Sequence, residues 1–226
     1  MNEKNKKIVV AIDGPAGAGK STAAKAVARK LGLPYLDTGA LYRAIAWKLD
    51  KENIRPEEDE KISEALKDLK LEIKGDTVFA DGADVSAAIR TPHIDALVSA
   101  YSARREVREA LVEMQRAQAV NGLVADGRDM GTVVFPDAQL KVFLTAAAEE
   151  RAKRRYAERV SRGEEADYDE ILKQVLERDH YDMTREISPL RPAPGGLILD
   201  STEMDAEQAA DAIASLALEF ERQENS

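Results

Sequence analysis

GPAGAGKS, from Gly14 to Ser21, directly follows an apolar run that ends at Asp13 and precedes a stretch with helical periodicity. Glycines in such a loop let consecutive backbone N–H groups point at one place beside a helix N-terminus, where phosphate oxygens bind. Lys20 is placed to reach the β- and γ-phosphates of a nucleoside triphosphate, and the Ser21 hydroxyl can ligate Mg²⁺. The stretch predicts a phosphate-binding loop, with a glycine-rich turn and an incidental lysine as the alternative. The residues expected to bind the nucleotide, ATP or GTP, are Gly14, Pro15, Ala16, Gly17, Ala18, Gly19, Lys20, Ser21 and Thr22.

Short apolar runs alternate with helical patterns along the rest of the chain. The runs expected to form buried parallel strands are Ile8 to Asp13, Pro34 to Asp37, Leu123 to Asp126, Leu140 to Thr145 and Leu197 to Asp200. The helical patterns cover about Lys20 to Leu31, Ala40 to Lys51, Glu57 to Leu69, Glu106 to Ala119, Ala147 to Arg162, Tyr168 to Ile187 and Asp205 to Arg222. This alternation predicts an α/β fold with a doubly wound, five-stranded parallel sheet of the P-loop NTPase type.

One interval departs from the alternation. Three short strand-like runs, Leu71 to Lys74, Thr77 to Ala80 and Ala83 to Val85, are joined by the turn dipeptides Gly75-Asp76 and Asp81-Gly82. They predict a small three-stranded antiparallel insert, which cannot bury a core of its own and must pack on neighbouring helices. We expect this insert to be a mobile clamp, with a surface meander as the alternative.

Composition limits the classes of protein to be considered. A chain of 226 residues with 44% hydrophobic and 5% aromatic content fits one enzyme-sized domain, 1–226. The start, Met1 to Lys7, is polar and no apolar run is long enough to span a bilayer, so we expect a cytoplasmic protein with no membrane partner. The chain has no cysteine and only two histidines, which excludes disulfides and zinc-type centres and leaves a hard, oxygen-bound metal. A net charge of -9 argues against a nucleic-acid polymer as partner.

A second segment with polar groups is DTGALYR, Asp37 to Arg43, which follows the second predicted strand. Because ligands gather at the carboxyl ends of parallel strands, this segment should face the same edge of the sheet as the phosphate-binding loop. An acceptor phosphate could lie between Thr38, placed as a helix N-cap, and Arg43, about one turn into that helix. The alternative is a capped helix with a solvated arginine.

A third segment is ADGRDMG, Ala125 to Gly131, which follows the third strand. Arg128 suits bidentate recognition of phosphate, whereas Asp129 only accepts hydrogen bonds and would recognise a donor such as an exocyclic amine. An ordinary surface Arg–Asp pair is the alternative. Asp126 is expected at most to support Mg²⁺ indirectly.

Residues 151–162 are rich in arginine and lysine, and helical spacing places Arg151 and Arg155 on one stripe. A solvated basic face, offset by nearby glutamates, is one explanation. The other is a helical lid that closes over both nucleotides, excludes water and brings guanidinium groups to the transferring phosphoryl. We expect Lys20, Arg128, Arg151 and Arg155 to be catalytic, and we expect substitution of either lid arginine to lower turnover with little loss of stability.

Six segments are informative in combination: GPAGAGKS, DTGALYR, IRTP at Ile89 to Pro92, ADGRDMGTVVFPDA at Ala125 to Ala138, ERAKRRY at Glu150 to Tyr156 and ISPL at Ile187 to Leu190. Together they resemble the bacterial cytidylate kinases, from about Ile8 to Thr202. The resemblance implies a nucleoside-monophosphate-kinase core (8–69, 103–145 and 188–222), a monophosphate-binding insert (70–102) and a lid with flanking helices (147–187). It also implies ATP with Mg²⁺ as co-substrate and CMP or dCMP as the acceptor.

The same resemblance implies roles for acceptor-binding residues at matching positions. They are Arg43 and Arg128 for the phosphate, with Thr38 where relatives have serine or threonine; Ser99, Arg108 and Asp129 for the cytosine edge; and Arg178, Asp182 and Arg185 for the sugar and nucleotide. Asp182 is suited to accept a hydrogen bond from a ribose hydroxyl. Ser102 remains an alternative to Ser99, because the register of LVSAYSARR is loose.

The chemistry of the reaction favours a monophosphate acceptor. A phosphate oxygen is already a nucleophile, so such an enzyme must position charges and needs no general base. No general base is evident, although Asp37 or Asp126 could serve as one. The alternatives are a P-loop kinase for another monophosphate or a coenzyme precursor, and a nucleotide-gated switch, although an NKxD sequence is absent. We expect the protein to be a monomer.

Overall fold

The computed structural model describes residues 8–224, which fall into two compact units. The first contains the described residues up to Leu36 and from Gln118 onward, and the second contains Asp37–Ala117. The polar start Met1 to Lys7 lies outside the described residues. No helix within residues 8–224 is both long enough and apolar enough to cross a membrane.

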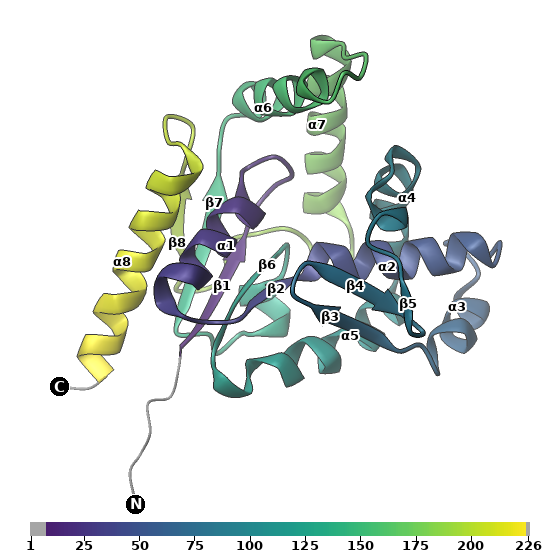
Figure 1. Cartoon of the computed structure of the whole chain (residues 1–226), viewed down its shortest axis with the longest axis horizontal. Coiled ribbons are helices and arrows are strands. Elements are labelled where there is room, and N and C mark those ends of the chain that lie inside the picture. The colour runs from purple at the N-terminus through teal and green to yellow at the C-terminus, as the bar shows by residue number, and fades with distance from the viewer. Residues whose placement is uncertain (1–7, 225–226) are drawn as a thin grey trace, which may run out of the picture. The chain divides into compact units, whose positions relative to one another are not determined.

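The first unit is built on a five-stranded sheet in the order β2-β6-β1-β7-β8 (Figure 1). The strands are β1 (Val9–Asp13), β2 (Tyr35–Asp37), β6 (Leu123–Gly127), β7 (Leu140–Thr145) and β8 (Leu197–Asp200). β1 lies in the centre and pairs in parallel with β6 and β7, with Asp13 opposite Gly127 and Phe143. The α/β fold expected from the sequence, a five-stranded parallel sheet of the P-loop NTPase type, is confirmed, and the loop after β1 leaves the sheet at the carboxyl end of its strands.

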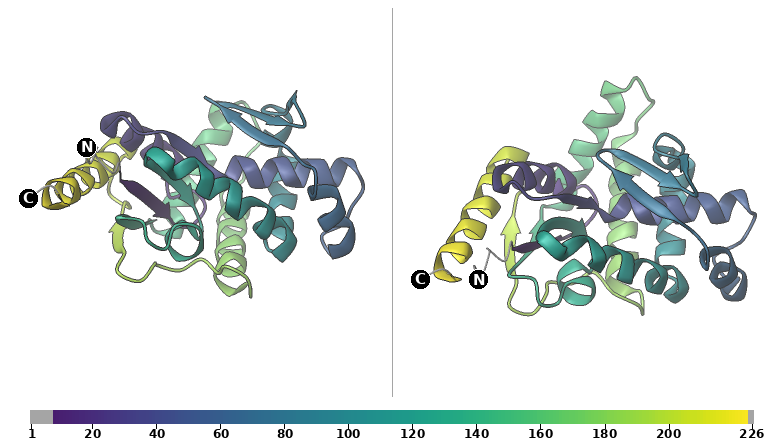
Figure 2. Two further views of the ribbon diagram at one scale, coloured as in Figure 1. Left: turned by 90° about the horizontal axis from the view of Figure 1, so that it is seen from below. Right: turned by 60° about the horizontal axis from the view of Figure 1, so that its bottom comes forward.

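The central strands are buried, as their apolar runs require. Val10, Ala11 and Ile12 in β1 are fully buried, and every residue of β6 is buried. α1 (Lys20–Leu31) and α8 (Ala206–Glu224) lie side by side against the core of these strands (Figures 1 and 2). β8 does not match the expectation of a buried strand: it is an edge strand with one neighbour, and its Leu197 and Ile198 are exposed.

α6 (Ala148–Ser161) and α7 (Tyr168–Thr184) form a helical hairpin in the first unit (Figure 1). The hairpin has a small core of its own, made by Ala152, Ile171 and Val175. Asp167 caps α7 by accepting the N–H of Glu170 at 2.8 Å. A separate core of this kind allows the hairpin to move as one body.

The second unit contains α2 (Thr38–Lys51), α3 (Asp59–Leu66), α4 (Pro92–Ser102) and α5 (Arg105–Ala117). Its three-stranded antiparallel sheet has the order β3-β4-β5 and consists of β3 (Leu71–Lys74), β4 (Thr77–Ala80) and β5 (Ala83–Asp84). β4 packs on α2, which Figure 2 shows from two directions, and buries Val78 and Ala80. The small sheet therefore depends on a helix for its core, as expected for three short strands.

Helix α4 is not among the elements expected from the sequence. Thr91 is its N-cap and accepts the N–H of Ile94 at 3.3 Å, and Pro92 occupies the first helical position. The buried residues Ile94, Val98 and Tyr101 recur at helical spacing. Both signals are present in the sequence, so this helix was predictable in principle.

Several element boundaries also differ from the sequence prediction. α2 begins at Thr38 and its N-cap is Asp37, whose Oδ1 accepts the N–H of Ala40 at 3.0 Å, so the prediction of Thr38 as N-cap is wrong. α7 ends at Thr184 because Arg185 has an extended backbone, with ψ at 144°. α3 ends at Leu66, and β5 is two residues long.

Candidate functional site

The phosphate-binding loop leaves β1 and returns as α1, so regular structure holds it at both ends. Gly14 has a φ of 153°, and a Cβ there would lie 1.9 Å from the carbonyl oxygen of Leu144 in β7. Any larger residue would force the loop away from the sheet. Gly19 is the N-cap of α1, and within residues 8–224 no side chain caps that end. The first amides of α1 are therefore available to an anion.

Lys20 is buried, with 6% of its surface exposed, and its Nζ donates to the carbonyl oxygen of Pro15 at 2.7 Å. Burial lowers the pKa of Lys20 well below its usual range, and repulsion from Arg128 adds to this, whereas Asp126 and Asp13 oppose it. A buried ammonium of this kind is stabilised when an anion binds beside it, because the charged form is then favoured. The phosphates of a nucleotide would supply that anion.

Asp126, in β6, joins the loop to β2. Its carboxylate accepts hydrogen bonds from the Ser21 hydroxyl at 2.9 Å and from the Tyr35 hydroxyl at 2.7 Å. Mg²⁺ prefers such oxygen ligands and takes only one or two from the protein when phosphates and water complete its shell. Among the described residues no cluster of three or more acidic, histidine or cysteine side chains could hold a metal alone. Ser21 and Asp126 therefore fit a magnesium ion that arrives with a nucleotide.

Asp13, the last residue of β1, is 2% exposed. Its carboxylate accepts the N–H groups of Met130 at 2.7 Å and Gly131 at 2.8 Å, which begin a short π-helix, Met130–Val134. Burial is the main cause that raises the pKa of Asp13 to about 6, although the hydrogen bonds from the two N–H groups lower it. The charge of Asp129 adds to the rise, and the charge of Lys20 opposes it. Asp13 is not among the site residues predicted from the sequence, although a carboxylate that directly precedes the loop is a usable signal.

Three arginines surround one buried carboxylate at the end of α7. Arg128 donates from Nε to Asp182 at 2.8 Å, and Arg185 lies 3.6 Å from the other oxygen of Asp182. Arg185 also donates twice to the carbonyl oxygen of Ser188. Burial alone would raise the pKa of Asp182, but Arg128, with Arg178 and Arg185, holds it below its usual value. The cluster has more cations than anions and suits an anionic ligand.

The two lid arginines of the sequence analysis have different surroundings. Arg151 is 4% exposed and pairs with Asp179 of α7 through Nη1 at 3.1 Å and Nη2 at 2.5 Å. It also donates from Nη1 to the carbonyl oxygen of Ala16 in the phosphate-binding loop at 3.0 Å. Arg155 is only half-buried. The expectation that Arg151 can be replaced with little loss of stability is therefore wrong on structural grounds, since its removal would leave Asp179 buried without its partner.

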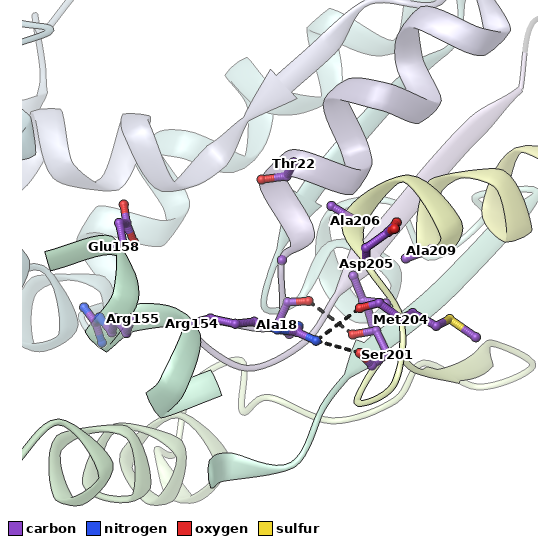
Figure 3. A pocket seen from close by; sticks show the side chains of 13 residues that line it. Ala18, Thr22, Arg154, Arg155, Glu158, Ser201, Met204, Asp205, Ala206 and Ala209 are labelled. Atoms are coloured by element: carbon purple, nitrogen blue, oxygen red, sulfur yellow. Dashed lines mark hydrogen bonds between the residues drawn. The ribbon is translucent and has the colours of Figure 1, made fainter. Parts of the chain in front are cut away.

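A cavity of about 300 Å³ lies beside the phosphate-binding loop (Figure 3). Its walls come from Gly17, Ala18, Gly19 and Thr22, from Arg154, Arg155 and Glu158 of α6, from Leu144, and from Ser201, Met204, Asp205, Ala206 and Ala209. Figure 3 shows Arg154 extending to the carbonyl oxygens of Ser201, at 2.7 Å, and Met204, at 3.2 Å. Arg154 thus fixes the segment that forms one wall. The cavity suits a flat, mostly apolar group attached to phosphates.

In the second unit, the expected acceptor-binding side chains have partners on neighbouring helices. Arg43 pairs with Asp95 at 3.0 Å. Arg108 donates to the Tyr42 hydroxyl at 2.9 Å and lies 5.2 Å from the centre of the Tyr42 ring. Neither partner is predicted from the sequence: Tyr42 stands inside DTGALYR, whereas only a predicted helix over residues 92–102 would have suggested Asp95.

The expected acceptor-binding residues divide between the two units. Thr38, Arg43, Ser99 and Arg108 belong to the second unit, and Arg128, Asp129, Arg178, Asp182 and Arg185 belong to the first. All the expected catalytic and ATP-binding residues belong to the first unit. There, repulsion from Arg128 and, less strongly, from Arg178 lowers the pKa of Lys20.

Comparison with known proteins identifies the family of the chain. The family model described as cytidylate kinase matches residues 10–219. A cytidylate kinase of Desulfitobacterium hafniense is 49% identical over 215 residues, which are 93% of each chain, and one of Bacillus subtilis is 46% identical over 92% of this chain and 95% of its own. A solved structure of an uncharacterized protein from Eubacterium ventriosum is 13% identical, with a TM-score of 0.54 over 95% of this chain and 99% of its own, and shares the fold. The chain belongs to the cytidylate kinase family.

Proposed function

We infer that this protein transfers the γ-phosphate of ATP to the 5′-phosphate of CMP or dCMP, which gives ADP and CDP or dCDP. The observation that supports this most directly is the phosphate-binding loop, where the buried Lys20 stands at the start of α1 and Ser21 donates to Asp126 at 2.9 Å. The arginines around Asp182 in the same unit suit a second anionic nucleotide. Family membership supports the choice of a cytidine acceptor.

The donor nucleotide would bind along the phosphate-binding loop. Its phosphates would accept hydrogen bonds from the first amides of α1 and from Lys20, which would leave the carbonyl oxygen of Pro15. Ser21 and Asp126 would hold Mg²⁺, which neutralises developing charge on the β- and γ-phosphate oxygens. The base of ATP would occupy the cavity beside the loop, between Thr22 and the wall that Arg154 fixes.

For the acceptor nucleotide we propose the roles that the family resemblance implies. Arg43 and Arg128 are assigned to its phosphate, and Asp182, with Arg178 and Arg185, to its sugar. Arg108 and Asp129 are assigned to the cytosine edge, where the 4-amino group needs an acceptor. Ser99 is preferred to Ser102, because the Ser102 hydroxyl donates to the Ser99 carbonyl oxygen at 3.1 Å within α4.

Catalysis would consist of alignment and charge supply. The acceptor phosphate oxygen attacks the γ-phosphorus and the bond to the β-phosphate oxygen breaks, so ADP leaves without the help of a protein nucleophile. Lys20 and Arg155 would stabilise charge on the transferring group, and closure of the α6–α7 hairpin would exclude water. Arg151 would contribute by holding the carbonyl of Ala16, and so the shape of the loop.

The direct test is an ADP-release assay with each common nucleoside monophosphate. CMP and dCMP should be phosphorylated with far higher kcat/KM than UMP or AMP, and Lys20→Met should abolish the signal. A preference for AMP, GMP or a coenzyme precursor would assign the chain to a different acceptor. Slow ATP hydrolysis that no monophosphate accelerates would favour a nucleotide-gated switch.

We further propose that the protein acts as a cytoplasmic monomer whose partners are small nucleotides. The net charge of -9 disfavours binding to nucleic-acid polymers. The lack of cysteine means that the fold needs no oxidising compartment. Light scattering at micromolar concentration should give one chain's mass, and a dimer mass would contradict this part of the proposal.

A further inference from the structure

Asp13 contacts the chain on both sides of the dipeptide Arg128-Asp129. We call this pair the acceptor dipeptide, because both residues are assigned to CMP. Before the dipeptide, Gly127 ends β6 directly opposite Asp13 in the β1–β6 ladder. After it, the Asp13 carboxylate accepts the N–H groups of Met130 at 2.7 Å and Gly131 at 2.8 Å. One residue of the central strand thus fixes the chain on both sides of the acceptor dipeptide.

The two amides need an acceptor because they begin a helix. In the π-helix Met130–Val134 the carbonyl oxygen of Asp129 accepts the N–H groups of Val133 and Val134, so the N–H groups of Met130 and Gly131 have no partner inside it. Met130 is fully buried, and water therefore cannot satisfy its amide. Asp13 supplies the acceptor from a position 117 residues away in the chain.

The same strand end carries the donor loop. Asp13 is bonded covalently to Gly14, the first residue of the phosphate-binding loop, while its side chain holds the turn that follows the acceptor dipeptide. The positions of the donor loop and of the acceptor dipeptide therefore both depend on Asp13. An error of about 1 Å in the alignment of reacting groups can cost about 100-fold in rate.

We propose that Asp13 is a positioning residue for the reaction, which orients Arg128 and Asp129 toward the acceptor nucleotide relative to the donor loop. This inference rests on the proposed function, because it assumes that the acceptor dipeptide contacts CMP. Asp13 itself need not touch either substrate. A merely structural role would instead make Asp13 matter only through the fraction of folded protein.

Graded substitutions separate the two roles. Asp13→Asn keeps one acceptor atom for the two amides, and Asp13→Ala keeps none. The control is Ile213→Val, which removes one buried methyl group from α8 in the same unit without touching the turn. For each variant, kcat and KM are measured with CMP, UMP and ATP at a temperature where circular dichroism shows the protein to be folded.

We expect Asp13→Asn to lower kcat/KM for CMP by about 10- to 100-fold. The loss with UMP should be smaller, so that the ratio of CMP to UMP efficiency falls, while KM for ATP changes less than about twofold. This ratio does not depend on the fraction of folded enzyme, and Ile213→Val should leave it unchanged. Equal losses with CMP and UMP, or no loss, would overturn the positioning role.

Amide hydrogen exchange followed by NMR provides a test that needs no activity. In the wild-type protein the Met130 and Gly131 amides should be protected as strongly as those of β6, although they lie outside the sheet, and Asp13→Asn should remove that protection at one or both. Fast exchange of both amides in the wild type would show that they do not bond to Asp13, and would overturn the proposal even if every variant failed to fold. The wild type could fail to phosphorylate CMP although both amides are protected and lose that protection in the variant. In that case the proposed function would be wrong, but the hydrogen bonds from the two amides to Asp13 would be confirmed.

Discussion

The buried carboxyl of Asp13 should make the protein less stable as the pH rises, and the substitution Asp13→Asn should remove this dependence. Its pKa is about 6 in the folded protein, against an ordinary value of 3.8. A raised folded-state pKa contributes stability that is fully present below 3.8 and is lost as the pH rises through about 6. At 1.36 kcal/mol per pKa unit the whole contribution is about 3 kcal/mol, of which about 2 kcal/mol lies between pH 4.5 and 7.5.

The assay is urea unfolding of the wild type and of Asp13→Asn across that pH range. Because asparagine does not titrate, the difference in unfolding free energy isolates Asp13, whose charged neighbours Asp129 and Lys20 remain in both proteins. The wild type should gain about 2 kcal/mol relative to the variant as the pH falls from 7.5 to 4.5. Asp84→Asn is a control that should show almost no change over this range, because hydrogen bonds from Ser86 lower the pKa of Asp84 and place its effect on stability at lower pH. A constant difference, or one that shrinks at low pH, would refute the reasoning for Asp13.

Three further predictions concern the reaction. Lys20→Met should lower kcat by about 100-fold or more while calorimetry shows nearly unchanged CMP affinity, and near-normal turnover would contradict the role of Lys20. Asp129→Ala should lower kcat/KM for CMP about 10- to 100-fold more than for UMP, and equal losses would remove Asp129 from cytosine recognition. Arg151→Ala should cost about 3–5 kcal/mol of stability by stranding Asp179, whereas Arg155→Ala should lower kcat with an unchanged Tm; similar melting curves for the two variants would contradict this contrast.

Much of the first unit could be predicted from the sequence because its signals are local. β7, β8 and α1 have the predicted bounds, since both strands are short, mainly apolar runs and α1 starts directly after a glycine-rich loop, although β8 is exposed at the edge of the sheet. The phosphate-binding loop follows from residue types at fixed spacing. Its need for glycine at position 14 is visible only in the structure, where a Cβ would meet the carbonyl oxygen of Leu144.

The contacts that set the electrostatics of the site could not be predicted in the same way. Asp13 and Met130 are 117 residues apart, Ser21 and Asp126 are 105 apart, and helical or strand periodicity carries no information on such pairs. The spacing of arginines on α6 likewise predicted one basic stripe. It could not show that Arg151 turns inward, because that depends on Asp179 of another helix.

Three of the cations assigned to substrate binding are held by groups of the chain itself, which helps an acidic protein to bind two polyanions. Arg43 pairs with Asp95, Arg128 pairs with Asp182, and Lys20 donates to the carbonyl oxygen of Pro15. A guanidinium has five N–H donors, so one carboxylate orients it and leaves other donors for a phosphate. The entropy cost of ordering these long side chains is then met during folding and not during binding. The net charge of -9 is compatible with a local excess of positive charge, since Arg128, Arg178 and Arg185 together face one buried carboxylate, Asp182.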